Sequence, residues 1–160
     1  MIKELCLNTG LKACVAFSRD FENYSFENEI RSEDRVKILW PYMELPIDPL
    51  IHQGSHMIHS LLKIFPNEKI SIDNFYKFQN KYLLEGFVGH RKLQCTLFQT
   101  SNDKEEYKIN ERVIPKVNFI KTNRLMFDQI QKFSHAMTEC SLDKALQTTI
   151  ILEKILMENT

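Results

Sequence analysis

Three of the protein's five histidines, His52, His56 and His59, fall within one short segment. If this segment is helical, spacings of four and seven residues place the three rings on one stripe of the helix. Asp48 lies one turn before His52, near the edge of that stripe. Histidine exchanges protons close to neutral pH, and a nearby carboxylate can orient its ring or raise its basicity. The spacing predicts an acid–base site in which His56, His52 and Asp48 are catalytic and His59 binds substrate.

Two other interpretations of these histidines stay open. The His-x-x-x-His spacing also lets two rings reach one zinc ion. The zinc-peptidase pattern, however, needs a glutamate directly after the first histidine, and Gln53 at that position cannot accept a proton. We therefore assign no metal. The remaining interpretation is that the three histidines are exposed or hydrogen-bonded and take no part in chemistry.

The histidines need a helix with a separate apolar face to position them. Pro49 suits the first position of a helix capped by Asp48, and Pro66 ends it near Phe65. The expected apolar stripe lies well round the helix from the histidines and consists of Ile51, Ile58, Leu62 and Phe65.

Residues 36–43 alternate as a strand that leads towards this helix. The strand carries Trp40 and Tyr42, and aromatic residues at such positions are typical of a core. Their place just ahead of the histidine helix nevertheless puts them near the predicted site, so we assign both to substrate binding.

The rest of the chain predicts a sheet followed by helices. Alternation indicates strands at 69–78, 81–88, 92–100 and 106–113, with a hairpin turn at 101–104, and a buried strand at 11–17. Helical spacing returns at 126–137 and again from Ser141, where the expected core stripe is Leu142, Leu146, Ile150 and Ile155. The predicted fold class is α+β: a mostly antiparallel sheet of about four to six strands with helices packed on one face.

Composition narrows the class of protein. The 160 residues contain 21 Lys+Arg and 21 Asp+Glu, so the formal net charge is zero. Such a chain lacks the surplus of positive charge with which proteins bind nucleic acid or acidic membranes. Its four glycines form neither Gly-x-Gly-x-x-Gly nor a phosphate-binding loop. We expect residues 1–160 to form one domain with no nucleotide site of either common type.

The four cysteines are scattered, and no Cys-x-x-Cys pair occurs. The sequence also shows no secretory leader and no apolar run of the roughly 18 residues that a membrane span needs. These features predict reduced, mostly buried thiols in a cytoplasmic protein without a membrane partner.

The histidine segment resembles a motif of the glucose–fructose oxidoreductase / inositol dehydrogenase (Gfo/Idh/MocA) family, an Asp-x-Gly-Ser-His-like run on the first helix of the C-terminal domain. Gly54, Ser55 and His56 match it, whereas His52 and His59 stand where the family has aspartates. In a second register, Asp48 and His52 form Asp-x-x-x-His. Three further stretches resemble the family: 9–21 its crossover strand, 69–113 its C-terminal sheet, and 127–153 its closing helices.

This resemblance implies the substrate-binding and oligomer-forming half of a two-domain oxidoreductase. Residues 1–21 resemble the end of the dinucleotide-binding domain, which is otherwise missing here and would come from the full-length protein or a partner chain. In the family a hydride moves between NAD(P) and a sugar or related hydroxy compound, and the motif histidine acts on the hydroxyl proton. That role falls on His56, with Asp48 and His52 as neighbours. The resemblance therefore implies a chain that is inactive alone and binds a small polar, sugar-like substrate.

Two rival functions remain. The strands at 69–113 contain more apolar residues than one helix-covered face is expected to absorb, which favours a homodimer or assembly module joined through the sheet. These residues are Ile70, Ile72, Phe75, Phe78, Leu83, Phe87, Leu93, Leu97 and Phe98. The other rival is a hot-dog-fold thioesterase or dehydratase, in which an antiparallel sheet wraps a central helix. Two long C-terminal helices do not suit that fold.

Overall fold

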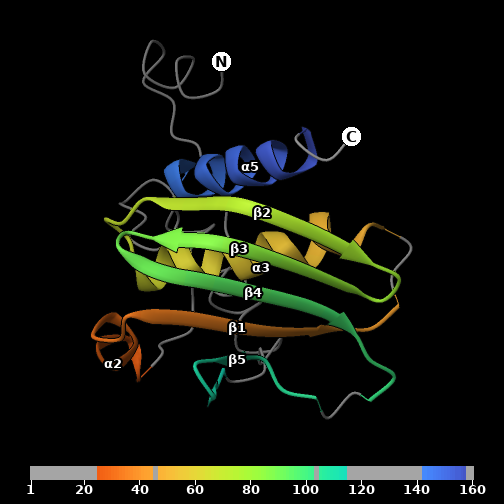
Figure 1. Ribbon diagram of the computed structural model, residues 1–160, viewed down its shortest axis with the longest axis horizontal. Helices are drawn as coiled ribbons and strands as arrows, with labels where there is room; N and C mark the ends of the chain where they lie inside the picture. The colour runs from red at the N-terminus through yellow and green to blue at the C-terminus, as the bar shows by residue number, and fades with distance from the viewer. Residues whose placement is uncertain (1–24, 45–46, 103–104, 115–141, 158–160) are drawn as a thin grey trace, which may run out of the picture.

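The structure is a computed structural model that describes residues 25–44, 47–102, 105–114 and 142–157. Within these residues, six strands form one sheet in the order β2-β3-β4-β1-β5-β6 (Figure 1). The strands are β1 (Arg35–Tyr42), β2 (Ile70–Phe78), β3 (Lys81–Val88), β4 (Arg91–Gln99), β5 (Lys108–Ile109) and β6 (Arg112–Val113). Only β1 and β4 pair in parallel, so the predicted mostly antiparallel sheet is confirmed.

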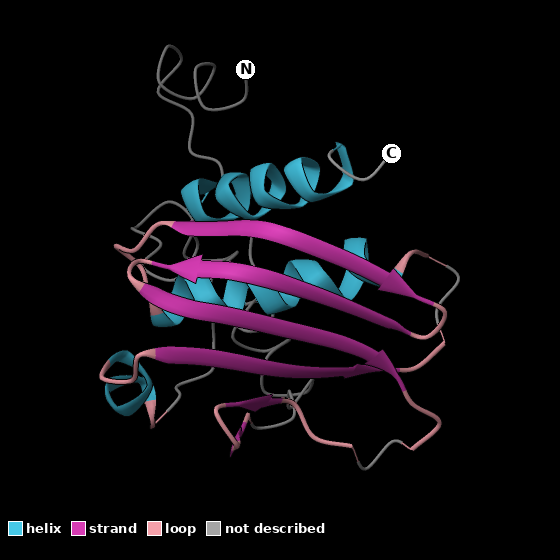
Figure 2. Cartoon of the chain, viewed as in Figure 1, coloured by secondary structure: helices cyan, strands magenta, loops and turns pink. Residues whose placement is uncertain are grey.

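In the part of the chain that the structure describes, three helices accompany the sheet: α2 (Glu27–Arg31), α3 (Pro49–Ile64) and α5 (Leu142–Met157). Figure 2 shows α3 behind the four long strands and α5 along the β2 side. The long helix α5 contacts both α3 and β2. The predicted α+β class, with helices packed on one face of the sheet, is confirmed.

The parallel pair also decides one topology question. The strand predicted at 106–113 was expected to form a hairpin with β4, and this expectation is wrong because β1 lies between β4 and β5. The segment instead forms the short β5–β6 hairpin, in which Asn110 and Glu111 have positive φ values of 47° and 66°. Asn110 Nδ2 donates a hydrogen bond to the Arg35 carbonyl (2.7 Å), which ties the turn to the start of β1.

The same pairing excludes the hot-dog alternative for the described residues. That fold wraps its helix in an antiparallel sheet, whereas all eight residues of β1 run parallel to β4. A parallel neighbour requires a long crossover connection. Here the crossover contains α3 as well as β2 and β3.

The core lies between the sheet and α3. Alternate residues of β1 and β4 point towards the helix: Val36, Ile38, Trp40, Leu93, Cys95 and Leu97 are all buried. Ile58, Leu62 and Phe65 are buried as predicted, but Ile51 is exposed. Its place in the first turn of α3 explains the difference, because burial becomes continuous only farther along the helix.

The core stripe predicted for α5 is largely wrong. Leu146 and Ile150 are 45% and 54% exposed, and only Ile155 of the stripe residues with described side chains is buried. The buried residues are Ala145, Thr148, Leu152 and Ile155. This helix has apolar residues on more than one side, and its contact with α3 selects the side that becomes buried.

Several predictions fall outside the described residues: the strand at 11–17, the helix at 126–137, the family-like stretch 9–21, and three of the four cysteines. The fourth, Cys95, is a free thiol in the core, and burial raises its pKa. None of the helices in the described ranges is both long and apolar enough to cross a membrane.

Candidate functional site

The site is organised by the first turn of α3. Asp48 is its N-cap, and Asp48 Oδ1 accepts a hydrogen bond from the Leu50 backbone N–H at 2.8 Å. Pro49 occupies the first helical position, where a missing N–H costs nothing. The predicted cap is therefore confirmed. This turn directly follows β1, whose Trp40 and Tyr42 both point towards the helix side of the sheet.

One group of side chains gathers around the other oxygen of Asp48. Tyr82 OH donates to Asp48 Oδ2 at 3.4 Å, and Lys77 Nζ lies 3.5 Å from the same oxygen. The Lys77 ammonium also sits 5.4 Å from the centre of the Tyr82 ring, an arrangement that favours a cation. Tyr42 completes the group, with its ring 6.5 Å from that of Tyr82. We call Asp48, Lys77, Tyr82 and Tyr42 the capping cluster.

The electrostatics of the capping cluster keep both phenols protonated. Burial raises the pKa of Tyr42 and Tyr82, and the negative charge of Asp48 raises each further. Interaction with Tyr82 and then with Asp48 raises the pKa of Lys77. The cluster consequently presents neutral hydroxyl groups and an ammonium group across the neutral pH range.

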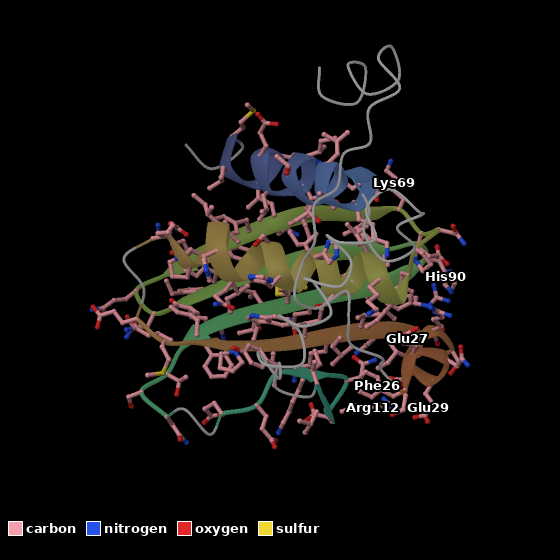
Figure 3. All side chains as sticks on the ribbon, turned by 180° about the vertical axis from the view of Figure 1, so that it is seen from behind. Phe26, Glu27, Glu29, Lys69, His90 and Arg112 are labelled. Carbon is pink, nitrogen blue, oxygen red and sulfur yellow. The ribbon has the colours of Figure 1, made fainter. Side chains whose placement is uncertain are left out.

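The second group is the imidazole stripe, His52, His56 and His59. Exposure falls along it: His52 is exposed, His56 is half-buried and His59 has no exposed surface. The rings of His52 and His56 meet edge to face, with centroids 5.6 Å apart and an interplanar angle of 69°. The stripe thus begins at the surface and ends in the protein interior. Figure 3 shows α3, the helix that carries the stripe, in front of the sheet.

A hydrogen-bonded chain connects this stripe to the sheet. Trp40 Nε1 donates to Gln53 Oε1 at 3.1 Å, and Gln53 Nε2 lies 3.0 Å from His52 Nδ1. The Trp40 ring is held from another side by Tyr107, at 4.7 Å between ring centroids. His52 is thereby oriented from the core although its ring is at the surface.

The predicted catalytic residues divide between these two groups. The structure brings His52 and His56 together. Asp48 lies at the same end of α3, and its backbone carbonyl accepts from the His52 N–H at 3.2 Å. The Asp48 carboxylate, however, is engaged by Leu50, Lys77 and Tyr82, whereas the His52 ring contacts Gln53 and His56. The structure therefore supplies His52 with an amide partner in the place predicted for a carboxylate.

The three residues assigned to substrate binding all lie beneath the surface. Trp40, Tyr42 and His59 are 1%, 6% and 0% exposed. His52 is exposed and His56 half-buried, so these two histidines offer more surface than the three residues assigned to substrate binding.

Gly54 of the motif also has a packing role. A Cβ at this position would lie 3.1 Å from Leu50 Cδ1 and 3.6 Å from Leu152 Cδ2 of α5. Its lack of a side chain thus allows close packing beside Leu50 and α5. Ser55 donates its hydroxyl to the His52 carbonyl at 2.6 Å, a contact within the helix.

Sequence reasoning did not identify Gln53, Lys77 or Tyr82 as site residues. Lys77 and Tyr82 are register partners across β2 and β3. The alternation of the two strands could have predicted them, because it places both residues on the face that α3 covers. Gln53 was considered only as a failed general base, and its contact with Trp40 depends on tertiary structure.

The zinc alternative receives no support from the described residues. They contain no group of three or more histidine, cysteine or carboxylate side chains close enough to hold a metal ion.

Comparison with known proteins gives matches in structure only. No protein-family model matches the chain, and no curated protein sequence does. A dehydrogenase (MviM) from Clostridium difficile matches with a TM-score of 0.66 and 16% identity, over 97% of this chain and 65% of that chain. The WlbA (WbpB) dehydrogenase from Thermus thermophilus, in complex with NAD and α-ketoglutarate, matches with a TM-score of 0.66 and 9% identity, over 94% and 57%. YvaA from Bacillus subtilis, described as an oxidoreductase, matches with a TM-score of 0.56 and 13% identity, over 98% and 66%.

The chain thus spans 57% to 66% of the length of these solved structures. At identities of 9% to 16%, the matches establish the fold. The resemblance predicted from the histidine motif is confirmed at the level of the fold: the chain shares its α+β fold with these dehydrogenases and this oxidoreductase.

Proposed function

We propose that this chain is the substrate-binding half of an NAD(P)-dependent oxidoreductase that acts on a sugar or a related small hydroxy compound. One observation carries the proposal: in a fold shared with dehydrogenases, His52 and His56 meet at the outer end of α3. Histidine exchanges protons close to neutral pH, so an imidazole pair that begins at the surface suits proton transfer with a substrate hydroxyl.

His56 is proposed to accept the proton of the substrate hydroxyl, and His52 is its neighbour at the surface. The capping cluster lies at the same end of α3, where the Lys77 side chain is 61% exposed and its ammonium group can contact a polar or anionic part of the substrate. Asp48 acts by fixing the first turn of α3 and by orienting Lys77 and Tyr82.

The described residues do not fit a dinucleotide. The chain's four glycines give no Gly-x-Gly-x-x-Gly run, and the one parallel strand pair is not followed by such a loop. Any NAD(P) is therefore proposed to bind to another domain, of the same protein or of a partner chain. Only the proton transfer is assigned to this chain.

This division of roles is tested by titrating the 160-residue chain with NADH and with NADPH and measuring the heat of binding by calorimetry. We expect no binding at micromolar concentrations, and micromolar binding would overturn the assignment of the cofactor to another domain.

The test of the substrate site is a ligand screen by NMR of ¹⁵N-histidine-labelled protein. The panel contains inositols, aldoses, 2-hydroxy acids and 2-oxo acids; the last class is included because the Thermus structure is a complex with α-ketoglutarate. At least one compound is expected to perturb His52 and His56 while the exposed His90 stays unchanged, and His56→Asn should weaken that compound's binding. The proposal fails if every compound leaves His52 and His56 unperturbed at millimolar concentration.

A second proposed function is assembly through the sheet face that α3 does not cover. Strand register places Tyr76, Leu83, Thr96 and Leu39 in one row of that face, and Phe78, Lys81, Phe98 and Pro41 in the next. Phe78 and Tyr76 are 54% and 45% exposed, an unusual amount of aromatic surface on neighbouring positions. We propose that a second copy of the chain covers this face, and sedimentation of a monomer at tens of micromolar would contradict it.

A further inference from the structure

The hydrogen-bonded chain from Trp40 through Gln53 to His52 has a defined direction. Trp40 is 1% exposed, and its ring is held against Tyr107. Its indole Nε1 lies 3.1 Å from Gln53 Oε1, and the Gln53 amide nitrogen lies 3.0 Å from His52 Nδ1. Both distances are normal for hydrogen bonds.

The indole decides which way the amide points. An indole N–H can only donate, so the atom of Gln53 that faces it must be the carbonyl oxygen. The amide NH₂ is then turned towards His52. Because an NH₂ group can only donate, His52 Nδ1 must be the acceptor, and a neutral His52 ring carries its proton on Nε2.

We infer that Trp40 and Gln53 are positioning residues that hold His52 in its Nε2–H tautomer. His52 thereby offers a hydrogen-bond donor at the exposed end of the imidazole stripe, and it recognises an acceptor oxygen of the ligand, such as a carbonyl or carboxylate oxygen. This last step rests on the proposed function. The neutral ring then has no free lone pair on Nε2 with which to accept a proton, and proton acceptance from the substrate is left to His56.

A matched pair of substitutions at residue 53 tests the direction of the hydrogen bonds from Trp40 through Gln53 to His52. In Gln53→Glu the side chain keeps its shape but has only acceptor atoms at neutral pH. It can still accept from Trp40, and it then requires a proton on His52 Nδ1, so the tautomer should reverse. In Gln53→Met the side chain keeps its length but makes neither hydrogen bond, so His52 should lose its fixed tautomer.

The measurement is long-range ¹H–¹⁵N correlation NMR of the full chain labelled with ¹⁵N-histidine, at about pH 8.5, above the ordinary titration range of histidine. The exposed His90 serves as the internal reference, and His52→Asn assigns the His52 signals. We expect His52 Nδ1 in the wild type to show the shift of an unprotonated nitrogen, Gln53→Glu to exchange the two nitrogen shifts, and Gln53→Met to give the tautomer mixture of His90. A wild-type His52 with the same mixture as His90, or one unaffected by Gln53→Glu, would overturn the inference.

The acceptor part is tested with pyruvate, whose oxygen atoms only accept under these conditions. Pyruvate should perturb the His52 Nε2 signal of the wild type more than that of Gln53→Glu, and equal effects in the two proteins would overturn this part. The tautomer is measured without any ligand. A fixed tautomer combined with a failed hydroxy-compound screen would therefore remove the proposed function alone, whereas a bound hydroxy compound with an unfixed tautomer would remove this inference alone.

Discussion

Asp48 has two separable contributions, because one carboxylate oxygen caps α3 and the other meets Lys77 and Tyr82. Asp48→Ala removes both and should lower the free energy of unfolding by about 1–2 kcal/mol, the usual cost of losing an N-cap. Asp48→Asn keeps an efficient cap and removes only the charge, so it should cost about 1 kcal/mol or less. Urea unfolding of the two variants measures the difference. Equal losses would mean that the contacts with Lys77 and Tyr82, and not the cap, make Asp48 important.

The buried phenols of the capping cluster predict a loss of stability in alkali. The pKa values of Tyr42 and Tyr82 are raised in the folded state, so their contribution is complete below about pH 10, the ordinary value for tyrosine, and is lost as the pH rises through the higher folded values. Urea unfolding between pH 8 and pH 11 should show this decline. Tyr82→Phe should make the decline shallower. The control is Tyr76→Phe, which removes an exposed phenol on the sheet face opposite α3. If this control had the same effect, the capping cluster would not be the origin of the decline.

The sequence predicted the contacts around the candidate site that depend on local spacing. The cap at Asp48 follows from an aspartate before a proline, and the contact between His52 and His56 follows from helical periodicity. Lys77 and Tyr82 join the site through the pairing of β2 with β3, and Gln53 joins through Trp40 of β1. Those partners are distant in sequence, and only the folded chain brings them together.

At the scale of elements, alanine substitutions at two glycines should affect the free energy of unfolding very differently. In α3, a Cβ on Gly54 would press on Leu50 Cδ1, the flexible end of a side chain, and would make an ordinary contact with Leu152. Gly54→Ala gains up to about 1 kcal/mol of helix propensity, and moving Leu50 offsets part of it. The free energy of unfolding should therefore change by less than about 1 kcal/mol.

In β3, a Cβ on Gly86 would collide with the backbone of β2 beside its bulge. It would overlap the Ser71 carbonyl oxygen and lie 2.9 Å from Ile72 Cα. Backbone atoms of a paired strand cannot move aside without breaking the pairing, so Gly86→Ala should cost about 1–3 kcal/mol or more. Thermal and urea unfolding of the two alanine variants provide the comparison. A loss at Gly86 as small as that at Gly54 would contradict the close packing described for β2 and β3.

Local patterns predicted most of the described elements but not their arrangement. The limits of α3 and of β1 to β4 agree with the predicted ranges to within one or two residues, because caps, prolines and alternation are local signals. The neighbours of β1 were not predictable in this way. Its parallel pairing with β4 and antiparallel pairing with β5 join segments separated by the whole helix and two or more strands. The buried side of α5 was likewise decided by its contact with α3.

On the scale of the whole molecule, the two faces of the sheet differ in what covers them. Of the apolar strand residues expected to exceed one face, Ile70, Ile72, Leu93 and Leu97 are buried on the helix side. The face that α3 does not cover carries Phe78 and Phe87, 54% and 40% exposed, and the half-buried Leu83 and Phe98. Burying such a face against a second copy would remove apolar surface from water, at about 25 cal/mol for each Å².

Substitution of Phe78 tests whether that burial occurs. Phe78→Glu replaces a large apolar side chain with a charged one beside Lys81, Phe98 and Pro41, and moving that charge out of water into an interface is costly. If a second copy covers the face, the wild type should sediment as a dimer at tens of micromolar and Phe78→Glu as a monomer. Leu146→Glu is the matched control, because Leu146 is similarly exposed, at 45%, but lies on α5. A dimer that survives Phe78→Glu and dissociates with Leu146→Glu would assign the interface to the helical layer. A monomeric wild type would contradict the proposal that a second copy covers the exposed aromatic surface.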